Sequence, residues 1–263
     1  MLPGAAAVNP QLLKLAARLE RDGKRLEAQA LRVLLAAYRD LSLADLITLI
    51  GAASQGESAR QRVAGVETLM RAFDEAARAL QTPPVALEAQ LRSAVLDGLT
   101  AGMQMLAAQA AEPELFDMFR LRPDAEIEFT RHASERLARY WGVEQTRLRN
   151  EVQSVLLEGL ERGQSVQQMR ARLRERVDVS RSRASLIVRN ELSNASAFAQ
   201  RESQQEAGVK EFIWWTASDD RVRAEHKARH GKKYSWDNPP GGEVPGSPIL
   251  CRCVALAVLP PST

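Results

Sequence analysis

The sequence of 263 residues predicts a mainly α-helical protein with a small α/β unit at its C-terminal end. Ala, Leu, Arg, Glu and Gln are abundant, whereas aromatic residues make up only 5% of the chain. This composition favours helix over sheet. Apolar residues recur at the helical period over most of the chain, and the aromatic and β-branched run KEFIWWTA at 210–217 is typical of a strand.

The overall composition excludes a membrane-spanning protein. Hydrophobic residues make up 45% and charged residues 26%, which is ordinary for a soluble globular protein. No apolar run approaches the about 18–20 residues of a membrane span. The N-terminus lacks a basic region ahead of an apolar core, so it is not typical of a secretory signal. We therefore expect no membrane partner and a chain that stays in the compartment where it is made.

Four helices are expected in the first part of the chain. Apolar periodicity predicts the first over 10–40, and SLAD at 42–45 resembles a capping box that opens a short second helix. A third is expected over 58–80, stopped by Pro83 and Pro84. A fourth over 85–110 would be about 40 Å long, which is typical of a bundle element or strut.

The stretch at 110–129 contains two prolines and predicts a boundary. After it, periodicity predicts a helix over 131–162, and Gly163 suits a left-handed C-terminal position. Ser165 and Gln168 form a capping box for the next helix, and a further helix is expected over 181–206, ended by Gly208. The expected domains are a helical N-terminal region at 1–125, a helical part at 126–209 and a small α/β unit at 210–263.

The C-terminal fifth alternates short elements. Asp219 or Asp220 would cap a short helix that ends at Gly231. KKYSWD could form a short strand, NPPGGEVPGSP is typical of a loop, and ILCRCVALAVL predicts a final buried strand.

Two histidines and the two cysteines of this region could form a metal site. His226 and His230 lie four residues apart, which places them on one face of a helix. Cys251 and Cys253 lie two apart, which points both thiols to one side of a strand. If helix and strand pack together, the four side chains could bind a tetrahedral structural zinc ion. The alternatives are small core cysteines with polar surface histidines, or a redox role.

A metal-dependent nuclease is a second hypothesis for the same region. In such an enzyme a histidine activates water beside a cation held by carboxylates. The commoner explanation is an aspartate cap followed by arginines in ion pairs. The residues that would serve a nuclease are Asp219, Asp220, His226, His230 and Asn238.

Arginines and tryptophans could contact nucleic acid. Net charge is only +3, but residues 165–210 hold nine Arg or Lys against five acidic residues. Such a segment can track phosphate, and a solvated helix face is the alternative. Trp214, Trp215 and Trp236 could stack on bases, although a core role is favoured. The arginines in question are Arg170, Arg172, Arg174 and Arg176.

Residues from about 150 to 259 resemble the phage head morphogenesis domain of the Mu protein F-like minor head proteins. The resemblance lies in the order of features: LERGQSVQQMRARL, then SRASLIVRNELSNASAFAQRESQQEAGV, a Trp-bearing strand, DDRVRAEHKARHGK, a Pro/Gly-rich loop and the terminal CRC. The positions that match are Arg189, Glu191, Gly208, Trp215, Asp219, Arg223, His226, Gly231, Cys251, Arg252 and Cys253.

Two positions depart from the family pattern. Asn190 stands where the family usually has Thr, and His230 falls where the family more often has another residue. A zinc site shared by the family would therefore use His226, Cys251 and Cys253, with Asp219 as fourth ligand and His230 as the alternative. An internal ion pair of Arg189 and Glu191 that anchors their helix is the simplest role for those residues.

The resemblance implies a non-enzymatic virion protein located inside the phage head near the portal. It would act in head morphogenesis and in genome packaging or delivery, after assembly in the host cytoplasm. The implied partners are the portal protein, the major capsid protein or scaffold, and packaged DNA, and 1–125 would serve as a docking region. The alternatives are a metal-dependent nuclease or DNA-processing enzyme that uses Asp219 and His226, and a general DNA-binding module.

Overall fold

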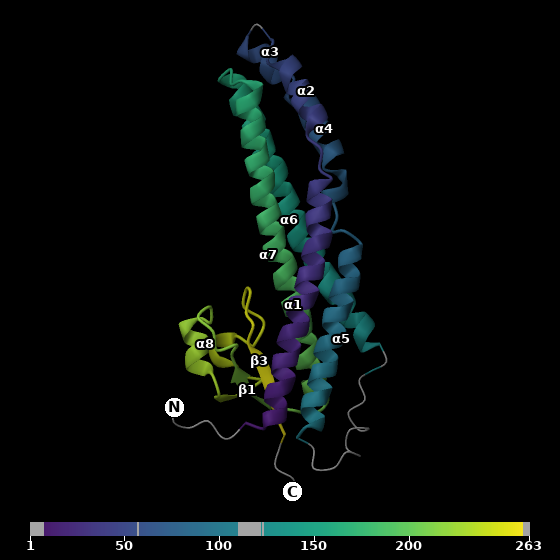
Figure 1. Ribbon diagram of the computed structural model, residues 1–263, viewed down its shortest axis with the longest axis vertical. Helices are drawn as coiled ribbons and strands as arrows, with labels where there is room; N and C mark the ends of the chain where they lie inside the picture. Colours follow the sequence, from purple (N-terminus) through teal and green to yellow (C-terminus); the bar gives the residue numbers. More distant parts are fainter. Residues whose placement is uncertain (1–7, 57, 110–121, 123, 260–263) are drawn as a thin grey trace. The chain divides into compact units, whose positions relative to one another are not determined.

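The structure is a computed structural model that describes residues 8–56, 58–109, 122 and 124–259 (Figure 1). It confirms a mainly helical fold with a small three-stranded antiparallel sheet near the C-terminus. None of the helices in the described ranges is long and apolar enough to cross a membrane.

The chain divides into two compact units, each built from segments distant in sequence. Unit 1 comprises Met1–Gln29, Glu88–Glu135 and Val188–Thr263, and unit 2 comprises Ala30–Leu87 and Arg136–Ile187. The domains expected in chain order, 1–125, 126–209 and 210–263, stay a prediction. The three longest helices in the described ranges are each divided between the two units, namely α1 (Pro10–Arg39), α6 (Ala125–Glu161) and α7 (Val166–Glu206).

Unit 2 is a helical bundle with one apolar core. Its shorter elements are α2 (Ala44–Ala53), α3 (Ala59–Ala64), α4 (Val66–Ala76) and the 3-10 turn η1 (Arg78–Leu80). Ile50, Phe73 and Val152 lie in this core, and Trp141 is fully buried. The Nε1–H of Trp141 donates to the carbonyl oxygen of Leu80 at 2.7 Å. This carbonyl, in the turn after α4, thereby gains a hydrogen-bond donor.

Two predictions in this part of the chain are wrong. The expected helix over 58–80 is broken at Gly65, which is the C-cap of α3 and the N-cap of α4. Glycine favours such a break because it has no Cβ and loses more conformational entropy in a helix than other residues do. The expected capping box at 42–45 does not form: Leu43 is the N-cap of α2 and makes no side-chain cap bond. Ser42 Oγ accepts only from the N–H of Ala44, at 3.4 Å.

Two of the long helices, α1 and α5 (Ala86–Ala107), begin and end close to their predicted limits. α6 ends near its predicted limit but begins at Ala125, before the predicted start at 131, so the end of the expected boundary at 110–129 is helical. Most of that boundary falls on residues outside those described. The capping box before α7 is confirmed, since Ser165 Oγ accepts from the N–H of Gln168 at 3.2 Å. Gly163 has a φ of 62°, as predicted for a left-handed helix end.

The expected separation of two helices near 178–181 is wrong. α7 continues for 41 residues, from Val166 to Glu206. No glycine or proline interrupts this range. The β-branched residues near Val177 each cost only about 0.5 kcal/mol in helix propensity, which is too little to end the helix.

The small sheet lies in unit 1 and consists of β1 (Glu211–Trp215), β2 (Lys233–Ser235) and β3 (Val254–Val258), in the order β2-β1-β3. Figure 1 shows β1 and β3 beside the short helix α8 (Ala224–Arg229), close to the first turns of α1. The central strand pairs Phe212 with Tyr234 on one side and with Ala257 on the other. The segment between β2 and β3 contains the 3-10 turn η3 (Pro240–Gly242).

The two faces of the sheet bury different sets of residues, as the period of two in a strand requires. Phe212 and Trp214 of β1 lie on one face, in a cluster with Trp236 and the two cysteines. Ile213 and Trp215 lie on the other face and pack against α1 and α5. The core interpretation of Trp214 and Trp236 is therefore confirmed.

The local details of the C-terminal elements correct two further predictions. Neither Asp219 nor Asp220 caps α8, whose N-cap is Arg223 with no side-chain cap bond. Cys251 and Cys253 precede β3, which begins only at Val254. The final strand is shorter than expected because Pro248 and a left-handed Leu250, with a φ of 53°, keep the preceding segment out of the sheet.

Candidate metal centre

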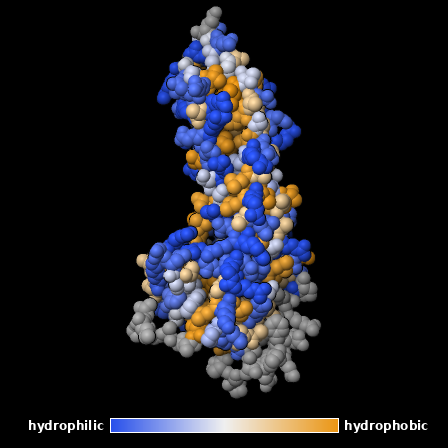
Figure 2. Space-filling model, viewed as in Figure 1, coloured by the Kyte–Doolittle hydropathy of each residue, from blue (hydrophilic) through white to orange (hydrophobic). Residues whose placement is uncertain are grey.

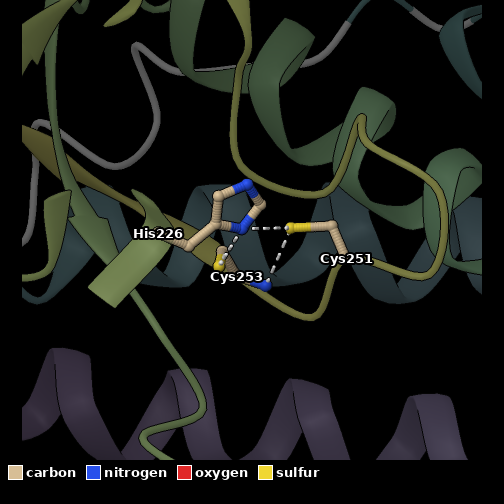
Figure 3. A group of neighbouring side chains, drawn as sticks. All are labelled: His226, Cys251 and Cys253. Atoms are coloured by element: carbon tan, nitrogen blue, oxygen red, sulfur yellow. Dashed lines mark hydrogen bonds between the residues drawn. The ribbon is translucent and has the colours of Figure 1, made fainter. Parts of the chain in front are cut away.

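His226, Cys251 and Cys253 form a buried cluster in unit 1 (Figure 3). The histidine comes from α8 and the cysteines from the segment that leads into β3. His226 Nδ1 lies 3.6 Å from Cys251 Sγ and 3.5 Å from Cys253 Sγ. One nitrogen and two sulfur atoms, the donor types that zinc prefers, therefore converge at one point.

α7 holds the cysteine segment in place. Ser193 Oγ donates to the carbonyl oxygen of Cys251 at 3.0 Å, and the N–H of Leu250 donates to Asn190 Oδ1 at 2.9 Å. The N–H of Cys253 points at Cys251 Sγ, at 3.5 Å. The chain thus turns so that both sulfur atoms face His226. The alternation of side chains along a strand does not cause this, because both cysteines precede β3.

The two nitrogen-to-sulfur distances fit a tetrahedral zinc ion. With Zn–S near 2.3 Å and Zn–N near 2.0–2.1 Å, the nitrogen-to-sulfur edge of a tetrahedron is about 3.6 Å. The two observed edges, 3.5 and 3.6 Å, agree with that value. An ion could therefore be bound with little movement of the side chains. Among the described residues the cluster offers these three ligands, which leaves a fourth position.

The two thiols are electrostatically unequal. A hydrogen bond with Cys253 lowers the pKa of the Cys251 thiol to about 6. The same hydrogen bond, together with burial, raises the pKa of the Cys253 thiol. A bound cation would favour loss of both protons because metal ligands bind as thiolates.

The structure does not bring Asp219 into this cluster. Both carboxylate oxygens of Asp219 accept from Arg252, at 2.6 and 2.7 Å. This ion pair lowers the pKa of Asp219 to about 2. Because Arg252 stands between the two cysteines in sequence, the pair joins the loop after β1 to the cysteine segment.

His230 also lies apart from the cluster. Its Nδ1 accepts from the N–H of Thr216 at 3.2 Å and lies 2.8 Å from Thr216 Oγ1. Its ring packs against Trp215, with the ring centroids 4.3 Å apart, and burial lowers the pKa of the imidazole. His230 therefore supports the end of β1.

Several other family-type positions have defined local roles in unit 1. Arg189 pairs with Glu27 of α1 at 2.8 Å, and buried Glu191 accepts from Asn190 Nδ2 at 3.0 Å. Arg223 Nη2 donates to the carbonyl oxygen of Ile249 at 2.7 Å. Gly208 and Gly231 have φ values of 81° and 73°, which explains glycine at both turns.

The four arginines predicted to contact DNA lie on α7 in unit 2. Arg172 pairs with Glu158 at 2.8 Å, and this bond lowers the pKa of the glutamate. Arg176 pairs with Glu175 at 3.2 Å. Arg170 and Arg174 are exposed. A DNA contact by these residues stays a prediction.

One charged residue beside the cluster gave no signal in the sequence. Glu243 Oε2 lies 3.6 Å from His226 Nε2 and accepts from Arg229 Nη1 at 2.6 Å. The bond from Arg229 lowers the pKa of Glu243, which is therefore ionised. Glu243 belongs to the Pro/Gly-rich loop and forms no recognised sequence motif with His226, so the sequence alone does not point to it.

The model of the family described as phage Mu protein F like protein matches residues 150–256 of this chain. The match confirms the resemblance predicted from the sequence, and the matched range includes all three residues of the cluster. An uncharacterized protein of Haemophilus influenzae is 29% identical over 111 residues, which cover 42% of this chain. The match spans a quarter (25%) of that relative's length. No solved structure matches the chain.

Proposed function

We propose that this chain is a non-enzymatic phage head protein that acts in head morphogenesis, with one structural zinc ion in its C-terminal part. The observation that supports this function is the match of residues 150–256 to the phage Mu protein F like family. The protein would lie inside the head near the portal and act in genome packaging or delivery. Its partners would be the portal protein, the major capsid protein or scaffold, and packaged DNA.

The geometry of the cluster favours a structural role over catalysis. His226, Cys251 and Cys253 are only 2%, 3% and 6% exposed, so a macromolecular substrate could not reach them. Figure 3 shows the imidazole and both sulfurs directed at one another. A nuclease that used Asp219 and His226 would need both groups free, but Asp219 is held by Arg252.

The head role is tested in particles. We expect mass spectrometry of purified heads, from a phage that encodes this chain, to detect it in filled heads. Deletion of its gene should reduce the yield of normal heads, and the purified chain should bind the portal ring of the same phage. Absence from the heads, or cleavage of plasmid DNA that His226→Ala abolishes, would overturn the proposal.

The zinc ion is tested on the purified, reduced chain. We expect about one zinc per chain by elemental analysis. Cys251→Ser and Cys253→Ser should each lose it, whereas the control His230→Gln should retain it because His230 lies outside the cluster. A wild-type protein without zinc, after refolding with excess zinc, would show that thiol–imidazole hydrogen bonds alone hold the cluster.

A further inference from the structure

We propose that Glu243, held by Arg229, is a positioning residue that orients His226 so that Nδ1 faces the metal position. This inference rests on the proposed zinc ion and adds a residue that coordinates nothing itself. It assigns a role to a charged residue of the Pro/Gly-rich loop, whose Val244 already packs against the cluster that contains the two cysteines.

The two ring nitrogens of His226 have different surroundings. Figure 3 shows Nδ1 directed at both sulfurs and the other ring nitrogen pointing away from them. That second nitrogen, Nε2, is buried and makes no hydrogen bond of ordinary length to the described residues. Glu243 Oε2 lies 3.6 Å from it, so a shift of about 0.7 Å would create an N–H···O bond of normal length.

Glu243 is fixed on its other side by Arg229. Arg229 Nη1 donates to Glu243 Oε2 at 2.6 Å, and the guanidinium lies over the Trp214 ring, 4.9 Å from its centroid. Trp214 in turn meets the ring of His226 edge-on, at 5.1 Å between centroids. The carboxylate, guanidinium, indole and imidazole therefore form one connected set around the histidine.

A carboxylate at Nε2 determines which nitrogen keeps the proton. A neutral imidazole has one N–H and one lone pair, and the hydrogen bond made by one nitrogen sets the role of the other. Glu243 stabilises the proton on Nε2, which leaves the Nδ1 lone pair directed at the two thiolates. Carboxylates placed in this way fix the ring and raise the basicity of metal-binding histidines.

Arg229 contributes by keeping the carboxylate in place. Glu243 lies in a loop that contains Gly241, Gly242 and Gly246, all at positive φ, and such a loop has little stiffness of its own. The side chain of Glu243 is 39% exposed, whereas that of Arg229 is only 16% exposed. The more buried cation therefore anchors the more exposed anion.

The test measures zinc affinity by competition with a chromophoric chelator. Glu243→Ala should weaken zinc binding about 10–100-fold, the usual effect of removing such an outer partner. Glu243→Gln should recover part of the loss because its amide oxygen still accepts from Nε2–H. The matched control is Glu225→Gln, which removes the same charge from an exposed position on α8.

A second measurement separates positioning from general stability. In the zinc-loaded protein, the Nε2–H of His226 should appear in proton–nitrogen NMR spectra as a proton protected from exchange. Glu243→Ala should lose that protection while far-UV circular dichroism stays unchanged, and Glu225→Gln should keep it. Circular dichroism also checks that each variant is folded.

The outcomes distinguish this inference from the zinc proposal. A wild-type chain that binds no zinc refutes the zinc ion. A wild-type chain that binds zinc, with Glu243→Ala and Glu243→Gln equal to Glu225→Gln in affinity and in proton protection, refutes the role of Glu243. Coordination through Nε2 in place of Nδ1 would also refute it.

Discussion

Replacement of Gly98 by alanine tests the close backbone approach of α5 and α7 in unit 1. Gly98 is a buried residue of α5 that faces α7. A Cβ atom at this position would lie 2.1 Å from the carbonyl oxygen of Ser196, and 2.9 and 3.0 Å from its carbonyl carbon and Cα. All three are backbone atoms of a helix, so no side-chain rotation can relieve the overlap.

The size of the effect follows from this distance. A normal van der Waals contact is about 3.4 Å or more, so α5 and α7 would have to separate locally by more than about 1 Å. Overpacking of this kind costs about 1–3 kcal/mol, and the higher helix propensity of alanine offsets only up to about 1 kcal/mol. Because the overlap is with backbone atoms, the upper end of this cost applies, and after the offset we expect Gly98→Ala to lower the free energy of unfolding by about 2 kcal/mol.

Gly23 provides a control with the same chemical change. It is exposed in α1, within unit 1, and a Cβ there would meet nothing within 4 Å. Gly23→Ala should therefore raise the free energy of unfolding by up to about 1 kcal/mol. Thermal unfolding followed by circular dichroism should place Gly98→Ala several degrees below the wild type, since about 1 kcal/mol corresponds to about 2–4 °C in proteins of this size. Equal midpoints for the two variants would refute the close approach of the helices.

Two further predictions concern single contacts. Trp141→Phe removes the donor to the Leu80 carbonyl and should cost about 1–3 kcal/mol, measured by urea unfolding; a change below about 0.5 kcal/mol would mean that this bond is absent. The ion pair with Arg252 lowers the pKa of Asp219 to about 2. The pair therefore stabilises the fold fully at pH values above the unfolded-state pKa of about 3.9. This contribution disappears as the pH falls toward 2. Asp219→Asn should therefore reduce the dependence of the unfolding midpoint on pH between about 4 and 2, and an unchanged dependence would contradict the ion pair.

The helices could be predicted because local signals determine them. The cap formed by Ser165 and the glycine at 163 act within a few residues of their helix ends, and both are confirmed. The break at Gly65 was missed because a single glycine is tolerated in many helices. The small β unit could be placed from its aromatic strand, but the limits of β3 depend on how Leu250 is held by α7, which is a contact over 60 residues.

The candidate metal centre could be predicted only in part. The sequence predicted His226 near the two cysteines because histidine and cysteine are typical zinc ligands and because the family resemblance includes all three positions. The cluster contains all three residues. The choice between Asp219 and His230 for a fourth position depends on long-range partners. Arg252 holds the first and Thr216 holds the second, and spacing along the chain reveals neither contact.

Asn190 has a structural role near the cluster. Asn190 Oδ1 accepts the N–H of Leu250, and its Nδ2 donates to buried Glu191. Leu250 has a φ of 53°, a conformation that costs about 1 kcal/mol for a residue with a Cβ and needs support from its surroundings. An amide offers separate donor and acceptor atoms, so it can serve both neighbours at once, whereas a Thr hydroxyl must do both through one oxygen closer to the backbone. Asn190 therefore helps to hold the turn that directs Cys251 toward His226.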